Sequence, residues 1–234
     1  MLGRLLDGSL KIVVASAEAA LQYTIPPGTY KFNTLSLKRG DTADISELAE
    51  RFSRAGYERR SQVDGACQFS VRGGILDFYS PQLQSPVRAE FWGDEIDSVA
   101  YFDLETQRRT KEIEEAFVAP AKEVLPDSKK ALTLMLKSVY ENLRGKQGVA
   151  AKKNIENDLQ RLDSGLEVAS PDRYLPLVYK YPATLFDYMP EAVFCVCEYI
   201  KQKETLKNLT LFCPYYIKIR PRLLHVARSS HSKI

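Results

Sequence analysis

The feature that most constrains the fold is a run of short segments, between residues 58 and 118, in which apolar and polar side chains alternate. Each segment is bounded by Gly, Pro, Asp or Ser, and the connections are short. A period of two predicts β-strands with one buried face, and short connections favour antiparallel neighbours. The predicted strands are residues 58–63, 68–72, 75–79, 87–92, 96–102 and 112–118.

One helix is predicted beside these strands. Apolar residues recur at helical spacing over residues 45–55, and Asp44 or Ser46 can cap the first turn. A further alternating segment, residues 31–38, precedes the helix. Residues 28–124 are therefore predicted to form a compact α+β domain, a twisted antiparallel sheet with one packed helix.

The segment before this domain has a different character. Residues 10–16 have the composition of a buried strand, and Ser16 can cap a helix that begins at Ala17. A lone strand and helix leave both sheet edges unpaired. We therefore interpret residues 1–27 as the C-terminal remnant of the first half of an incomplete α/β domain.

The segment after the domain returns to helical spacing. Two helical segments are predicted around residues 131–139 and 155–162, separated by the polar, glycine-bearing residues 144–153. Three strand-like segments follow, at residues 177–180, 185–188 and 192–196. We interpret residues 125–206 as the part of the chain that returns to the incomplete α/β domain.

Basic charge is concentrated in the last segment, residues 207–234. It holds six Lys or Arg residues and no acid, although the whole chain has a net charge of only +3. One interpretation is a nucleic-acid-contacting extension, since acid-free basic tails attract phosphates. The alternative is non-native sequence translated past a frameshift, which we favour because the stretch around Tyr215 is apolar. In both cases we expect a basic tail, disordered or non-native.

No transmembrane segment or secretory signal is predicted. The longest apolar runs are far too short to cross a bilayer. The N-terminus lacks a basic region followed by an apolar stretch and a cleavage site. We therefore expect a cytoplasmic protein with no membrane partner.

The sequence predicts no catalytic residue, metal site or cofactor. A phosphate-binding loop with the spacing Gly-x4-Gly-Lys-Ser/Thr is absent, and residues 1–206 contain no histidine. Cys195 and Cys197 lie too close in sequence for the usual zinc spacing, so free thiols are the simpler interpretation. The paired carboxylates fit solvated charge at turns. We expect a binding protein and not an enzyme.

The central domain resembles a known family, and the resemblance covers about half of the chain. Its motifs are Arg72-Gly73-Gly74-Ile75-Leu76-Asp77-Phe78, Pro86-Val87-Arg88 and Glu90-Phe91-Trp92-Gly93-Asp94-Glu95-Ile96. They are similar to the second domain shared by UvrB and the transcription-repair coupling factor. The resemblance implies docking onto the nucleotide-excision-repair protein UvrA.

The flanking sequence favours the coupling factor over UvrB. Residues 174–177 and 182–190 are similar to the returning part of the coupling factor's first domain. UvrB would carry its ATPase Asp-Glu pair after the following strand, where this chain has Cys197 and Glu198. The departure removes the aspartate that would organise magnesium.

The docking residues are predicted from strand alternation and from the resemblance. Alternation places Arg88 and Trp92 on one face of a strand, and an exposed Trp beside Arg is typical of an interface hot spot. The resemblance implies that Arg72, Arg88 and Trp92 contact UvrA, although the family more often has Phe at the last position. The alternative is that Trp92 is buried and that the arginines only solubilise the sheet.

The predicted function is therefore that of a docking module, which recruits UvrA to DNA lesions at stalled RNA polymerase in nucleotide excision repair. The resemblance implies that the intact parent also contacts RNA polymerase and double-stranded DNA, through motor domains absent from this chain. Two alternatives remain: part of a UvrB-like ATP-dependent DNA repair helicase, and a DNA-binding module that acts through the basic tail.

Overall fold

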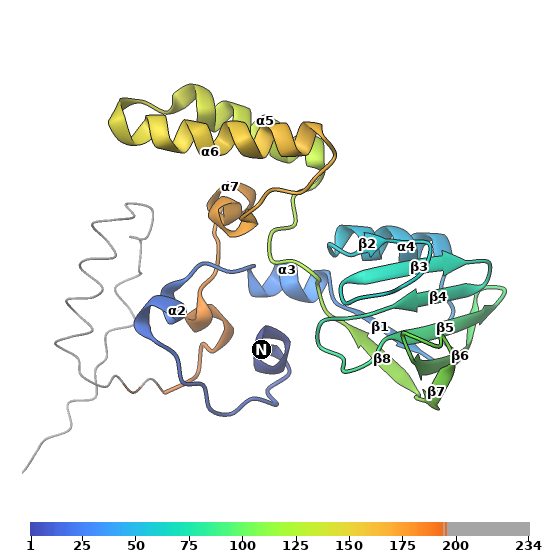
Figure 1. Cartoon of the computed structure of the whole chain (residues 1–234). Coiled ribbons are helices and arrows are strands. Elements are labelled where there is room, and N and C mark those ends of the chain that lie inside the picture. Colours follow the sequence, from blue (N-terminus) through green and yellow to red (C-terminus); the bar gives the residue numbers. More distant parts are fainter. Residues whose placement is uncertain (194, 196–234) are drawn as a thin grey trace, which may run out of the picture. The chain divides into compact units, whose positions relative to one another are not determined.

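The computed structural model describes residues 1–193 and 195, and its chain divides into two compact units (Figure 1). The larger unit spans residues 24–182, and residues 1–23 pack with the segment that begins at Ala183. Cys197, the expected boundary after residue 206 and the basic tail lie outside the described residues. The described part contains no helix that is long and apolar enough to cross a membrane.

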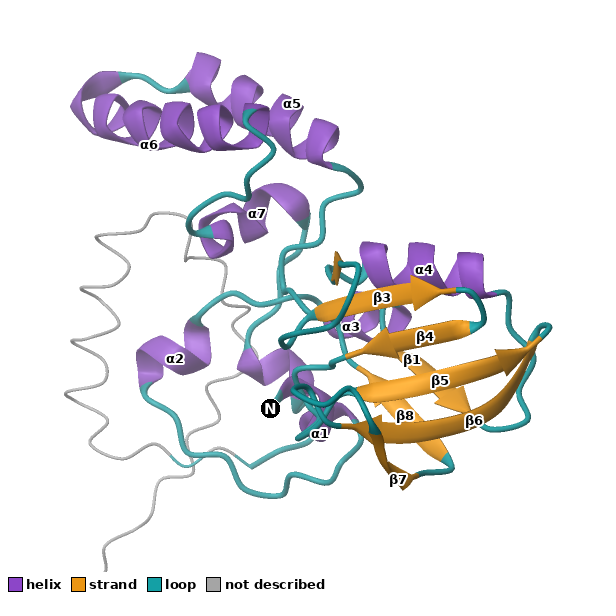
Figure 2. Cartoon of the chain, turned by 45° about the vertical axis from the view of Figure 1, so that its right-hand side comes forward, coloured by secondary structure: helices purple, strands orange, loops and turns teal. Residues whose placement is uncertain are grey.

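The larger unit is built on a six-stranded sheet (Figure 2). Its strands follow the order β2-β3-β4-β5-β6-β7, and every neighbouring pair is antiparallel except β2 and β3. The sequence-based expectation of an α+β fold with a largely antiparallel sheet is confirmed. The strands are β2 (Glu58–Arg59), β3 (Gln68–Arg72), β4 (Ile75–Phe78), β5 (Val87–Trp92), β6 (Glu95–Phe102) and β7 (Arg109–Glu112).

A single core holds this sheet, a helix and a second, two-stranded sheet together. Helix α4 (Ile45–Arg54) packs its apolar stripe on the six-stranded sheet, and β1 (Leu35–Lys38) pairs antiparallel with β8 (Glu115–Val118). Phe52 is fully buried at the centre, with the rings of Tyr57, Phe69 and Phe78 all within about 5.5 Å of its own ring. Aromatic packing of this kind contributes beyond the burial of area alone.

Local capping explains where α4 begins. The Asp44 carboxylate accepts hydrogen bonds from the backbone N–H groups of Glu47, at 2.9 Å, and Ser46, at 2.6 Å. These bonds favour the ionised carboxylate and lower the pKa of Asp44. The predicted cap and helix are confirmed, and the chain leaves the helix through Gly56, whose φ of 89° lies in the left-handed region.

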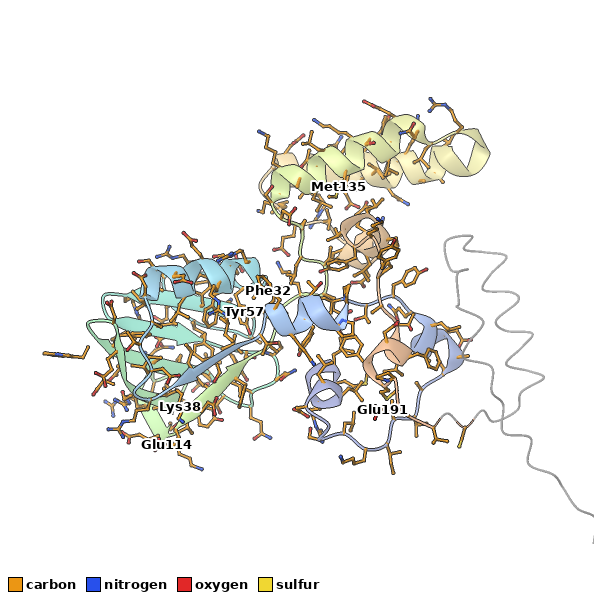
Figure 3. The ribbon with its side chains drawn as sticks, turned by 180° about the vertical axis from the view of Figure 1, so that it is seen from behind. Phe32, Lys38, Tyr57, Glu114, Met135 and Glu191 are labelled. Carbon is orange, nitrogen blue, oxygen red and sulfur yellow. The ribbon has the colours of Figure 1, made fainter. Side chains whose placement is uncertain are left out.

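Tyr57 ties the end of α4 to the segment that follows β8 (Figure 3). Its hydroxyl donates a hydrogen bond of 2.6 Å to the carbonyl oxygen of Ala119. Burial of the phenol raises the pKa of Tyr57. The neutral hydroxyl therefore acts as a donor over the whole range in which proteins are normally studied.

The remainder of the larger unit is helical. Helix α3 (Pro27–Phe32) precedes β1, and α5 (Lys129–Asn142) and α6 (Gly145–Asp163) pair around Leu132, Leu136 and Ile155. A 3-10 turn, Pro171–Tyr174, and the short helix α7 (Leu175–Val178) follow. The buried Asp158 carboxylate accepts a hydrogen bond of 2.6 Å from the Tyr174 hydroxyl, which fixes this return segment to α6.

The described residues of the smaller unit, 1–23, 183–193 and 195, form two short helices and one 3-10 turn. They are α1 (Leu2–Leu6), α2 (Ala17–Leu21) and the turn Leu185–Tyr188. Leu5, Ala183, Leu185 and Tyr188 form its small core. As predicted, the Ser16 side chain caps α2 by accepting a hydrogen bond from the backbone N–H of Ala19.

Residues 10–16 do not form the predicted buried strand. They carry no strand or helix, and Ile12 and Val14 are 80% and 94% exposed. The described residues supply no neighbouring strand to which the backbone groups of this segment could bond. An apolar run becomes a strand only when another strand completes its hydrogen bonds.

Several predicted elements in the flanks are also wrong in type. All of the segment 144–153 except its first residue lies within α6, residues 177–180 begin in α7, and residues 185–188 form a 3-10 turn. Lys, Gln and Ala are good helix formers, so they carry α6 through the glycine-bearing stretch. Of the strand predicted at 192–196, residues 192, 193 and 195 are not extended in any sheet, and the others lie outside the described residues.

Two elements of the central domain differ from the prediction at their ends. Only the first two residues of the segment 31–38 belong to α3, because Pro27 is well placed to start a helix, and the strand β1 begins at Leu35. The segment 112–118 contains parts of two strands in different sheets, β7 and β8. The chain leaves one sheet and enters the other around Ile113, a change that alternation alone does not reveal.

Candidate docking face of the six-stranded sheet

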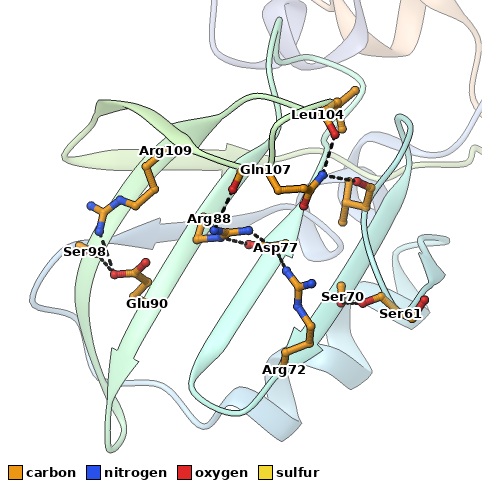
Figure 4. A network of polar contacts seen from close by, with 11 residues as sticks. Ser61, Ser70, Arg72, Asp77, Arg88, Glu90, Ser98, Leu104, Gln107 and Arg109 are labelled. Atoms are coloured by element: carbon orange, nitrogen blue, oxygen red, sulfur yellow. Dashed lines mark hydrogen bonds and ion pairs between the residues drawn. The ribbon is translucent and has the colours of Figure 1, made fainter.

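One face of the six-stranded sheet packs on the core, and the opposite face is polar at its centre (Figure 4). Strand pairing places Ser70, Asp77 and Arg88 in one row across β3, β4 and β5. The next row contains Arg72, Ile75 and Glu90. Because side chains two residues apart on a strand share a face, both rows lie on the side opposite α4. We call this side the polar face.

Asp77 is the centre of the polar face. It is fully buried, yet its carboxylate bonds to two arginines from the neighbouring strands. Arg88 contacts it twice, with Nε to Oδ1 at 2.7 Å and Nη2 to Oδ2 at 2.9 Å. Arg72 contacts it once, with Nη2 to Oδ2 at 2.6 Å. Two guanidinium groups therefore share one carboxylate, and the cluster carries a net charge of +1.

Arg88 is an internal support and not an exposed side chain. Its side chain is only 13% exposed, its Nη1 donates to the Gln107 carbonyl oxygen at 3.2 Å, and its guanidinium lies 4.9 Å from the centre of the Phe102 ring. The hydrogen bonds that Arg88 donates to the Asp77 carboxylate favour the charged guanidinium and raise the pKa of Arg88. The prediction that Arg88 and Trp92 are exposed together is wrong, because Asp77 draws Arg88 down onto the sheet.

Arg72 lies at the open edge of the same cluster. Its side chain is 43% exposed, and within the described residues its only polar contact is the one to Asp77. A guanidinium group has five N–H donors, and among the described residues Arg72 uses one of them. Arg72 is thus anchored at one nitrogen and available at the others.

Trp92 is exposed, as predicted. The residue is 85% exposed at the end of β5, directly opposite Glu95 on β6. The pairing of the two strands shifts between Glu90 and Phe91, but Phe91 still packs on the core. Alternation therefore continues through the irregularity, and Trp92 leaves the strand on the side of the polar face.

Two glycine-containing turns lie next to each other at this end of the sheet. Gly93, with a φ of 62°, forms the hairpin after Trp92, and Gly73, with a φ of 58°, forms the hairpin after Arg72. The backbone N–H of Phe91 donates to the Gly74 carbonyl oxygen at 2.7 Å. A Cβ atom at Gly74 would lie 2.9 Å from the Phe91 carbonyl oxygen, so only glycine allows this close approach.

The register gives the spacing of the two exposed candidates. Arg72 and Glu90 occupy one row with β4 between them, and Trp92 follows Glu90 by two residues. Strands are spaced by roughly 4.8 Å and residues rise by roughly 3.4 Å, so the two Cα atoms are about 12 Å apart. Both side chains fit easily within one partner patch of standard size.

Two loops cover the other end of the polar face. The Gln107 side-chain amide donates to the carbonyl oxygens of Val63, at 3.3 Å, and Leu104, at 2.8 Å. Gln107 adopts a φ of 59°, unusual for a residue other than glycine. Its carbonyl oxygen thereby accepts the bond from Arg88, so the buried cluster also fixes the turn after β6.

Sequence reasoning missed Asp77 and Gln107 as parts of this site. Asp77 had a visible signal, because a charged residue interrupts the apolar residues of β4. A fully buried carboxylate requires a compensating charge, and arginines precede and follow it in the sequence. Gln107 gave no signal. Within the described residues no group of three or more His, Cys, Asp or Glu side chains could hold a metal ion.

The domain that carries the polar face matches a known protein family. Residues 35–124 match the family described as the UvrB interaction domain. The chain is 30% identical over 209 residues to the transcription-repair-coupling factor of Bacillus subtilis (strain 168), which covers 86% of this chain and 18% of that protein.

Related coupling factors from staphylococci give the same result. The protein of Staphylococcus haemolyticus is 32% identical over 200 residues, and that of Staphylococcus aureus (strain MRSA252) is 28% identical over 218 residues. These alignments cover 81% and 88% of this chain. The chain spans only 17% to 18% of the length of the relatives named above.

Proposed function

We propose that this chain, which carries a UvrB interaction domain and is homologous to the N-terminal part of transcription-repair-coupling factors, docks onto UvrA through its polar face. One observation carries the proposal. The only tryptophan of the chain is 85% exposed at the end of β5, within the matched domain and on the same face of the sheet as the partly exposed Arg72. An exposed Trp next to Arg is the composition of an interface hot spot.

The exposure of Trp92 determines how much surface it can bury on binding, and so how much it can contribute to the free energy of binding. A tryptophan that moves from solvent into a partner pocket buries roughly 150 to 250 Å² of surface. Truncation of such an anchor commonly costs about 2 kcal/mol or more, which is roughly 30-fold in affinity. Arg72 adds a charge with unused donors at the edge of the same patch. Arg88 contributes to binding indirectly, because its ion pair with the buried Asp77 stabilises the sheet.

In this proposal the chain supplies binding only. It presents the polar face to UvrA, and so recruits UvrA to lesions at which RNA polymerase has stalled. Contacts with RNA polymerase and double-stranded DNA, and the movement along DNA, belong to other parts of the longer coupling factors. Residues 28–124 form the docking domain, and residues 1–27 and 125–206 belong to the flanking α/β domain.

Calorimetric titration of purified UvrA with the full chain tests the proposal. We expect wild-type protein to bind and Trp92→Ala to weaken binding roughly 30-fold. Phe32→Ala is the matched control, because Phe32 is 77% exposed but lies outside the sheet. Absence of binding by the wild type, or affinities of Trp92→Ala and Arg72→Ala that both equal that of the wild type, rules the proposal out.

A further inference from the structure

The two arginines of the polar face are connected through a single buried atom. Oδ2 of Asp77 accepts hydrogen bonds from Nη2 of Arg88 and from Nη2 of Arg72. Asp77 has no exposed surface, whereas Arg72 is 43% exposed. The conformation of a partly exposed side chain is therefore set by a residue that a partner cannot touch.

The contact with Asp77 restricts the side chain of Arg72 more than the side chain of an ordinary surface arginine is restricted. In the register of the sheet, Asp77 faces Ser70, and Arg72 reaches it diagonally from two residues further along β3. Without this contact Arg72 would be a long flexible side chain beside a glycine turn, with the positive charge of Arg88 nearby. Like charges repel, and a flexible side chain loses freedom when it binds. The Asp77 carboxylate offsets the repulsion between the two arginines and already restricts the side chain of Arg72 in the unbound protein.

We infer that Asp77 is a positioning residue of the docking face, which holds Arg72 in the conformation that a partner recognises. This inference rests on the proposed docking function, and it adds a residue that does not itself touch the partner. It implies that Asp77 and Arg72 act as one unit in binding. Trp92, on the neighbouring β5 beyond the irregular pairing, acts independently of both.

A double-mutant cycle separates positioning from general support of the fold. The affinity of the full chain for UvrA is measured by calorimetry for wild type, Arg72→Ala, Asp77→Asn and the double variant. Trp92→Ala is combined with Asp77→Asn in the same way. We expect Asp77→Asn to weaken binding about tenfold in the wild type, but less than about threefold once Arg72 is Ala. In the Trp92→Ala background its effect stays about tenfold.

The two sets of results distinguish the inference from the docking proposal. If Arg72→Ala and Trp92→Ala both leave affinity unchanged, docking through this face is wrong. If they weaken binding but Asp77→Asn has no effect, or the same effect with and without Arg72, docking stands and the positioning role is wrong. If Asp77 only supports the fold, Asp77→Asn weakens UvrA binding by the same factor in the Arg72→Ala and Trp92→Ala backgrounds.

Asp77→Asn leaves Arg88 without a counter-charge and can unfold the sheet, so a second background is needed. Asp77→Asn combined with Arg88→Gln removes both charges and keeps a hydrogen-bonding amide at each position. Circular dichroism first confirms that this protein is folded. We expect Arg72→Ala to change its affinity for UvrA by less than about threefold, because Arg72 is no longer held. An effect as large as in the wild type overturns the inference.

Discussion

The substitution Arg88→Ala tests the assignment of this arginine as a buried support. Arg88 makes two hydrogen bonds to Asp77, one to the Gln107 carbonyl oxygen, and a cation–π contact with Phe102. Among the described residues, removing Arg88 leaves the fully buried Asp77 carboxylate with one hydrogen bond, that from Arg72. The variant therefore isolates the consequence of an undercompensated charge inside the sheet.

The magnitude follows from burial. Breaking a buried ion pair by removing one partner typically costs about 3 to 5 kcal/mol, because the remaining charge is neither solvated nor paired. Arg72→Ala is the matched comparison, since it removes a guanidinium from the same carboxylate. Arg72 is 43% exposed and leaves Asp77 with both contacts to Arg88, so its loss should cost about 1 kcal/mol or less.

Hydrogen exchange of the backbone amides in β4 and β5 measures the effect. The method reports the opening free energy of the sheet itself, which matters because two compact units need not unfold in one transition. We expect Arg88→Ala to lower that free energy by about 3 to 5 kcal/mol and Arg72→Ala by a third of this or less. Equal effects, or a cost below about 1 kcal/mol for Arg88→Ala, would refute the assignment.

Four further substitutions test the fold that presents the site. Asp44→Ala should lower the melting temperature at pH 7, and the difference from wild type should shrink below about pH 4, because a carboxylate with a lowered pKa stabilises only while ionised. Gly74→Ala should cost more than Gly73→Ala, as measured by urea denaturation, because only the former places Cβ against the Phe91 carbonyl oxygen. Phe52→Ala should cost about 3 to 5 kcal/mol in the same assay, and a cost below about 1 kcal/mol would contradict its central place in the core.

Strands and turns of the central domain could be predicted closely from the sequence. The boundaries of β3 and β5 agree with the predicted segments, and the helix α4 begins at the predicted cap. These elements combine clear periodicity with a turn or capping residue at each end. The exposure of Trp92 followed from the same alternation, because Val87 and Ala89 had to face the core.

Elements that depend on a distant partner could not be predicted. Residues 10–16 and α7 are both short and apolar, and neither becomes a strand. A short apolar run is compatible with a strand, a helix or an exposed segment, and tertiary contacts decide among them. The change of sheet around Ile113 has the same origin, since β7 and β8 differ in the strands that they pair with and not in local pattern.

The place of Arg88 depends on a register that the sequence does not determine. The two-residue turn at Gly73 and Gly74 fixes β4 against β3, so a contact between Arg72 and Asp77 follows from turn geometry. The loop between β4 and β5 is longer and allows more than one register. A shift of β5 by two residues would keep every side chain on its face and place Glu90 or Pro86, instead of Arg88, beside Asp77. Composition thus identifies two arginines and a tryptophan as candidates. Only the register shows that Arg88 supports the sheet from a buried position, whereas Arg72 is left exposed enough to contact a partner.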